Sequence, residues 1–152
     1  MTQIVTQSKL YARDFVAWCE DTVAKLKTGR FSEIDINSLI EEIEGLAGRD
    51  KRELKNRLRV LINHLLKRIY VESPDDYRGW ELTIREQRRQ ILDLLEQSPS
   101  LGNYFVEVFV KCSEDAREDA REDYPKVQFP DEWMFSRDID ALLREKFWLT
   151  IN

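Results

Sequence analysis

The residues best suited to metal chemistry are the single histidine, His64, and three glutamates, Glu41, Glu42 and Glu44. Helical bundles hold metal ions through inward-facing glutamates and Glu-x-x-His pairs. That pair is absent, although Glu41 and Glu44 have the i, i+3 spacing. His64 follows Glu44 by 20 residues, which is about 30 Å along an unbroken helix. A metal-binding enzyme that uses Glu41, Glu44 and His64 therefore requires a helix folded back at Gly45–Gly48, or ligands from a second chain.

His64 also fits a role without chemistry. On a helical wheel it lies at the flank of an apolar stripe, where one ring nitrogen can be bonded and the other exposed to water. A histidine can act as a general base, but no hydroxyl or thiol nucleophile is paired with it at a readable spacing. The chain also lacks a Gly-rich phosphate loop, a nucleophile elbow and a dinucleotide fingerprint. We therefore expect no catalytic residue and no cofactor, and favour a protein that is not an enzyme.

The charges are distributed unevenly along the chain. Residues 49–89 carry a net charge of +5, whereas residues 1–48 carry −3 and residues 90–152 carry −7. A basic region with nearby aromatic residues could bind nucleic acid through phosphates. It could equally pack against the acidic ends of the same chain. Because the total charge is −5, we favour the second interpretation and keep nucleic-acid binding as an alternative.

Length and composition predict one helical domain over residues 1–152. The chain is 42% apolar and contains four Trp, five Tyr and seven Phe, enough for a sizeable core. Its longest uncharged run has ten residues, half of the roughly 20 that a membrane helix needs, so no membrane partner is expected. The beginning of the chain lacks the pattern of a secretory signal. Two cysteines are too few for a disulfide scaffold and favour the cytoplasm.

Apolar residues recur at the helical period along the whole chain. The pattern predicts an all-α fold, an antiparallel bundle of about four main helices with a short C-terminal helix. The expected ranges are about 8–28, 36–71, 77–97, a helix that begins at Pro99, and 137–146. The residues expected to cap these helices are Ser8, Asp35 or Ser32, Asp76, Ser98 and Ser136.

Two features inside these helices make further predictions. Leu39, Ile43 and Leu46 lie close to the face that continues through Leu54 and Leu58, so the long helix is expected to bury one continuous stripe. Gln87 falls on the inward face of its helix and therefore needs a polar partner. Small residues at Gly45–Gly48 and Ala116–Ala120 offer surfaces for close helix packing, including self-association.

Several motifs together resemble a known family. They are DFVAW at 14–18, the run LIEEIEGLAGRDKRELKNRLRVLINHLLK at 39–67, WELTIREQRRQI at 80–91, SPSL at 98–101 and FPDEW at 129–133. The chain is similar over nearly its whole length to the bacterial family called domain of unknown function 29. The resemblance implies an all-α fold and no assigned activity. It also implies that candidate binding residues lie in the family's motifs, namely His64, Lys67, Trp80, Gln87 and Arg88.

These observations favour a cytoplasmic helical interaction or scaffold module that binds a protein partner or a second copy of itself. The two alternatives are a nucleic-acid-binding protein that uses residues 49–89 and a metal-binding helical-bundle enzyme.

Overall fold

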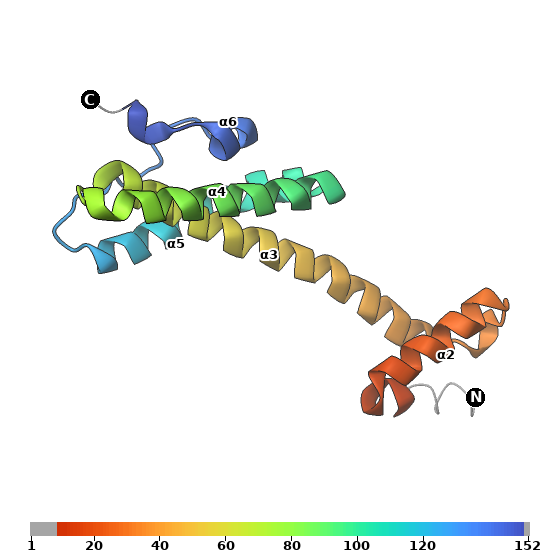
Figure 1. Cartoon of the computed structure of the whole chain (residues 1–152). Coiled ribbons are helices and arrows are strands. Elements are labelled where there is room, and N and C mark those ends of the chain that lie inside the picture. The colour runs from red at the N-terminus through yellow and green to blue at the C-terminus, as the bar shows by residue number, and fades with distance from the viewer. Residues whose placement is uncertain (1–8, 151–152) are drawn as a thin grey trace. The chain divides into compact units, whose positions relative to one another are not determined.

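The computed structural model describes residues 9–150, and all the regular structure in this range is helical (Figure 1). The elements are α2 (Phe15–Lys27), η1 (Phe31–Glu33), α3 (Ile36–Tyr70), α4 (Pro74–Gln97), α5 (Leu101–Asp123), α6 (Ile139–Arg144) and η2 (Phe147–Leu149). The prediction of an all-α fold with four main helices and a short C-terminal helix is confirmed. Within the described range, no helix combines the length and the apolar character needed to cross a membrane.

The chain divides into two compact units, residues 1–48 and residues 49–152. The N-terminal unit holds α2, η1 and the first turns of α3, which together we call the N-terminal hairpin. The C-terminal unit holds the rest of α3 with α4, α5 and α6, and α6 packs against both α4 and α5. The expectation of one domain over residues 1–152 stays a prediction.

Helix α2 is shorter than the predicted range of 8–28. Residues 9–13 are helical, but Asp14 has non-helical backbone angles (φ −145°, ψ 89°) and its side chain accepts a hydrogen bond from the backbone N–H of Ala17. Asp14 therefore begins a new helix as its N-cap, and the cap expected at Ser8 lies outside the described residues. The predicted end of the helix is confirmed, because Gly29 adopts the left-handed conformation that favours glycine (φ 74°).

Helix α3 begins where Asp35 was expected to cap it. The Asp35 carboxylate accepts from the Ser38 backbone N–H at 3.3 Å and from the Ser38 hydroxyl at 2.6 Å. The helix then continues unbroken through Gly45 to Tyr70. A Cβ atom added to Gly45 would meet nothing within 4 Å, so this glycine does not mark a close helix crossing.

The later helices begin at positions that differ slightly from the predictions. Helix α4 starts at Pro74, ahead of the expected cap Asp76, because proline's fixed φ angle suits the first helical position. Helix α5 starts at Leu101, after a turn that includes Pro99. Helix α6 covers only Ile139–Arg144, and the Ser136 hydroxyl accepts a hydrogen bond from the backbone N–H of Asp138 just before it.

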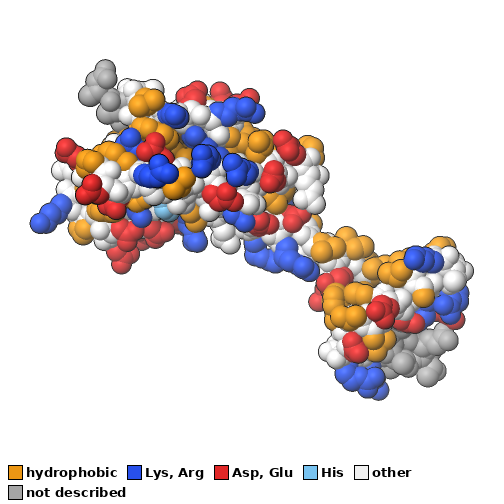
Figure 2. Space-filling view, viewed as in Figure 1, with side chains coloured by type: hydrophobic (Ala, Val, Ile, Leu, Met, Phe, Trp, Pro, Cys, Tyr) orange, Lys and Arg blue, Asp and Glu red, His pale blue; other side chains and the backbone are white. Residues whose placement is uncertain are grey.

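The interior of the N-terminal unit is largely polar. Its buried apolar side chains are Trp18 and Ile34, and its buried polar side chains are Thr22, Lys25, Asp35 and Ser38. Among the described residues, neither the Trp18 indole nitrogen nor the Thr22 hydroxyl has a hydrogen-bond partner. Apolar side chains lie instead on the outside of the hairpin, as Figure 2 shows.

This arrangement corrects the prediction that α3 buries one continuous stripe. Ile43 and Leu46 are 58% and 53% exposed, whereas Leu54 and Leu58, further along the helix, are completely buried. The period places all these residues near one face, but the neighbours that cover the later part of α3 belong to the C-terminal unit.

The C-terminal unit has a conventional apolar core. Leu61 and Leu65 of α3 pack there with Ile91 of α4 and Phe105 of α5, all fully buried. The Asn63 amide joins two helices by donating to the Ala116 carbonyl oxygen at 3.1 Å. Ala116 and Ala120 are themselves fully buried, so the Ala116–Ala120 surface is used within the unit and is not free for self-association.

Candidate functional site

His64 lies on the outer flank of α3, half-buried, as the sequence indicated. Its Nδ1 atom is 2.9 Å from the Val60 carbonyl oxygen. Because a carbonyl can only accept, Nδ1 carries the proton and donates it. Burial lowers the pKa of His64 below its ordinary value and is the main cause; the Val60 hydrogen bond opposes this effect, and the charge of Lys67 adds to it. The neutral ring is therefore favoured in the folded protein.

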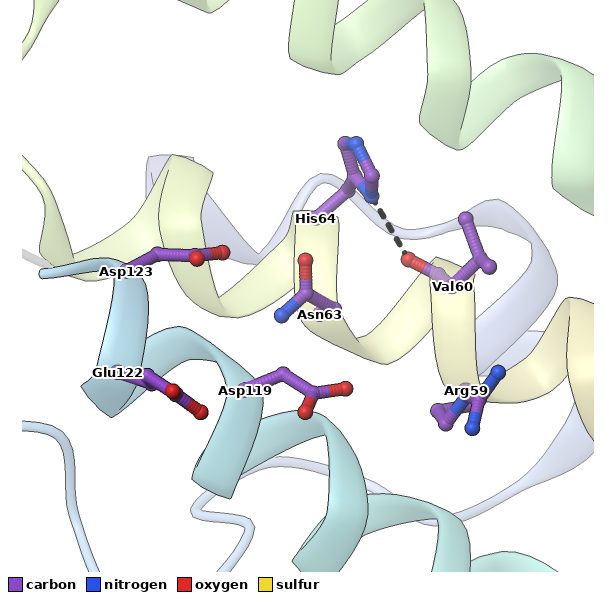
Figure 3. A pocket seen from close by; sticks show the side chains of 7 residues that line it. All are labelled: Arg59, Val60, Asn63, His64, Asp119, Glu122 and Asp123. Carbon is purple, nitrogen blue, oxygen red and sulfur yellow. Dashed lines mark hydrogen bonds between the residues drawn. The ribbon is translucent and has the colours of Figure 1, made fainter.

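A cavity of about 290 Å³ lies beside His64, lined from α3 by Arg59, Val60, Asn63 and His64 and from α5 by Asp119, Glu122 and Asp123. Figure 3 shows that the His64 ring points away from Asp119 and Glu122, toward its hydrogen bond with Val60. The ring and the carboxylates therefore do not converge on one point, as the ligands of a single metal ion must.

The metal site expected from Glu41, Glu44 and His64 stays a prediction, since the two glutamates belong to the N-terminal unit and the histidine to the C-terminal unit. Helix α3 runs from Ile36 to Tyr70 without an interruption at Gly45–Gly48. No group of three or more His, Cys, Asp or Glu side chains in residues 9–150 could hold a metal ion. Ligands from a second chain stay a prediction.

Lys67 and Trp80 meet at a third residue, Tyr124. The Lys67 ammonium is 3.3 Å from the Asp123 carboxylate and lies 5.9 Å from the centre of the Tyr124 ring. Trp80 contacts the same ring edge-on, with 6.1 Å between ring centres, and packs on Tyr77 on its other side. The structure thus places these two candidates around one aromatic side chain, half-buried between α3, α4 and the end of α5.

Gln87 has the polar partner that its position required. Its side-chain oxygen accepts a hydrogen bond from an Arg57 guanidinium nitrogen at 3.3 Å. It is half-buried, at the edge of a groove about 470 Å³ in volume that Arg49, Arg52 and Arg57 also line.

Arg88, the next residue, forms hydrogen bonds with the C-terminal segment. Its guanidinium donates to the Leu142 carbonyl oxygen at 2.9 Å and to the Glu145 carbonyl oxygen at 2.6 Å. Burial lowers the pKa of Arg88 to about 10, with the charge of Glu145 opposing the shift, so the side chain remains charged at neutral pH. Arg88 therefore holds the end of α6 against α4.

Several cations of the basic region 49–89 are engaged within the chain. Arg57 pairs with Glu53 at 2.9 Å, and Arg68 pairs with Glu81 at 3.5 Å while stacking on Tyr77. The pair between Lys67 and Asp123 joins the basic region to the acidic end of α5. The contact between Lys67 and Asp123 agrees with the interpretation that acidic and basic segments pack together. The other two pairs lie within residues 49–89, and all three reduce the charge left for phosphates.

A second cavity was not identified from the sequence. It has a volume of about 580 Å³ and lies between α4 and the C-terminal segment. Two of its arginines, Arg78 and Arg85, are seven residues apart and so share a helix face. This spacing could have indicated one wall of the cavity from the sequence. The residues opposite them, Lys146 and Trp148, are brought near only by the docking of the chain's last segment.

The motifs that place these side chains match one family model, described as Domain of unknown function DUF29, over residues 10–148. The chain belongs to this family. The match covers both units and every candidate residue named above, and it confirms the resemblance inferred from the motifs. The family's description assigns no activity. Comparisons with curated proteins and with solved structures found no match.

The pKa of His64 leads to a test of its neutral state. We expect the wild-type chain to lose stability relative to His64→Gln as the pH falls below 6.5. In that range the unfolded chain takes up a proton before the folded chain does, because burial lowers the folded pKa below the ordinary 6.5. The stability that depends on the neutral ring is thus complete above pH 6.5 and declines toward the lowered pKa.

Urea unfolding of both chains at a series of pH values measures this difference, in which the titrations common to both chains cancel. The prediction is contradicted if the difference in free energy of unfolding between the two chains does not change with pH, or if the wild type becomes relatively more stable as the pH falls.

Proposed function

We propose that the protein is a helical interaction module that associates with a second copy through the apolar surface of its N-terminal hairpin. The observation that carries the proposal is that this hairpin buries mainly polar side chains and exposes apolar ones. In residues 9–150, nine of the fourteen exposed large apolar side chains belong to it, namely Phe15, Val16, Val23, Leu26, Phe31, Ile36, Ile40, Ile43 and Leu46. A concentration of this kind marks an interaction surface in soluble proteins.

Association would bury the apolar side chains that the hairpin exposes. Among residues 9–48, its interior buries only two large apolar side chains, Trp18 and Ile34, and a unit of this size rarely folds with so small a core. Burying an exposed isoleucine or leucine fully contributes about 1.5–3 kcal/mol. Contact with another apolar surface would therefore supply the stabilisation that the hairpin's own interior does not.

The spacing on α3 suits a helix–helix contact. Ile36, Ile40 and Ile43 are four and three residues apart and all about half exposed, which is the spacing of a coiled-coil seam. A seam of identical residues can pair with itself in a symmetric dimer.

The charges near this seam favour an antiparallel second copy as the occupant. Glu41 and Glu44 are exposed beside the seam, Lys27 is exposed at the end of α2, and Arg30, 3.6 Å from Glu33, is exposed in the turn that follows. In an antiparallel pair, the Ile36 end of one seam lies beside the Ile43 end of the other, so Lys27 and Arg30 of each chain approach the acidic side chains beside the partner's seam. Opposite charges at such a contact favour correct pairing.

The oligomeric state tests the proposal. We expect light scattering and sedimentation to give a mass approaching twice 18.1 kDa as the concentration rises. The double variant Ile36→Lys/Ile40→Lys should weaken the dimer at least about tenfold, because it places charges in the apolar seam.

A matched control is Val106→Lys/Val110→Lys. These valines are also four residues apart and exposed (64% and 49%, against 50% and 48% for Ile36 and Ile40), but they lie on α5. The control should dimerise like the wild type, and circular dichroism should show equal helix content in all three chains. A wild-type monomer at every concentration, or equal effects of the two double variants, would refute the proposal.

A further inference from the structure

The cavity between α4 and the C-terminal segment combines positive charge with apolar walls. Its lining residues are Arg78, Glu81, Leu82, Ile84, Arg85, Arg88, Leu143, Lys146 and Trp148. The volume of about 580 Å³ lies within the range of sites for small organic ligands, about 300–1,000 Å³. All these residues belong to the C-terminal unit, so the cavity is independent of the hairpin surface.

Three of the four cationic side chains that line this cavity have no charged partner among the described residues. Within residues 9–150, no ion pair or hydrogen bond engages the side chains of Arg78, Arg85 or Lys146. The acidic residue of the lining, Glu81, lies 3.5 Å from Arg68 and so already has a cationic partner. Cations gathered at one cavity repel one another, and a bound anion would relieve that repulsion.

Apolar side chains line part of the cavity. Ile84 is buried in the core, Leu143 is partly buried against it, and Leu82 is 44% exposed. The Trp148 ring is held by the Arg68 guanidinium, 5.2 Å from the ring centre. Arg88 keeps the wall on the side of α6 in place through its two backbone carbonyl partners.

We propose that this cavity binds a small amphipathic anion, with a carboxylate or phosphate group on an apolar body. Arginine pairs with both groups through two parallel hydrogen bonds, which Arg78 and Arg85 are free to make. The apolar body would lie against Leu143 and Trp148. An inorganic anion would leave these walls in water, and a neutral apolar molecule would leave the cations unpaired, so both should bind more weakly.

Isothermal titration calorimetry on the full chain with four probes tests this inference. Decanoate and decyl phosphate carry both features, whereas decanol lacks the charge and inorganic phosphate lacks the apolar body. We expect saturable 1:1 binding of decanoate, of decyl phosphate or of both, and at least about tenfold weaker binding of the other two probes. The tighter of the two amphipathic probes identifies the anionic group as carboxylate or phosphate.

The matched variants are Arg85→Gln and Arg89→Gln. Both side chains are exposed on α4 and both changes remove one positive charge, but Arg89 lies outside the cavity beside Glu86. Arg85→Gln should weaken binding about tenfold and Arg89→Gln should not change it. The proposal is overturned if neither amphipathic probe binds, if decanol or phosphate binds as tightly, or if the two variants behave alike.

Discussion

Replacing Phe147 with alanine is expected to lower the free energy of unfolding by about 3–5 kcal/mol, the range for removing a buried aromatic side chain. Phe147 is only 1% exposed. Its ring centre lies 5.3 Å from that of Trp133 and 5.2 Å from that of Phe135. The substitution would leave a void among these rings and weaken the attachment of the last segment to the C-terminal unit.

Urea unfolding followed by circular dichroism measures this effect. The control is Leu149→Ala, two residues later, because Leu149 is 68% exposed and should change stability by less than about 0.5 kcal/mol. Equal effects of the two variants would show that the aromatic cluster does not anchor the segment. Because Phe147 lies between Lys146 and Trp148, we also expect Phe147→Ala to weaken binding in the cavity that those two residues line.

Replacing Arg88 with methionine is expected to lower the free energy of unfolding by about 2–4 kcal/mol. The two hydrogen bonds from its guanidinium to the Leu142 and Glu145 carbonyl oxygens would be lost. A hydrogen bond to a charged group contributes about 1.5–3 kcal/mol. Because the bond to the Glu145 carbonyl is exposed to solvent, the two bonds together should contribute less than twice this amount. Methionine preserves much of the aliphatic stem, which limits the loss of packing.

Arg89→Met is the control, since Arg89 is exposed and lies 3.8 Å from Glu86 across one turn of the same helix. Surface pairs of this kind contribute about 0–1 kcal/mol. If Arg88→Met destabilises the protein no more than Arg89→Met, the contact between α4 and the end of α6 does not depend on Arg88.

The helices and much of the core of the C-terminal unit could be predicted from the sequence because their causes are local. The spacing of Leu54 and Leu58 predicted a buried face, and both side chains are fully buried. Asp35 and Gly29 mark helix limits through their own side-chain and backbone properties. The helical wheel placed Gln87 on the inward face of its helix, so its need for a polar partner could be predicted. The sequence did not identify Arg57 as that partner.

The candidate sites depended on contacts between distant segments. Glu41, Glu44 and His64 suggested metal ligands by type, but no group of three or more such side chains in residues 9–150 could hold a metal ion. Lys67 and Trp80 meet only because the end of α5 brings Tyr124 between them. Arg88 lay within a motif, but its two acceptors are more than fifty residues later in the chain.

The sequence by itself determined an all-α chain, most of its helix limits to within a few residues, its family and the core face of α3 from Leu54 onward. Only the tertiary structure decided that Ile43 and Leu46, close to the same face, are exposed, and that Lys146 and Trp148 complete a cationic cavity with α4. The physical reason is that helical periodicity aligns apolar side chains along a helix. Whether they are buried depends on the neighbours that cover them, which the long-range packing of the chain determines.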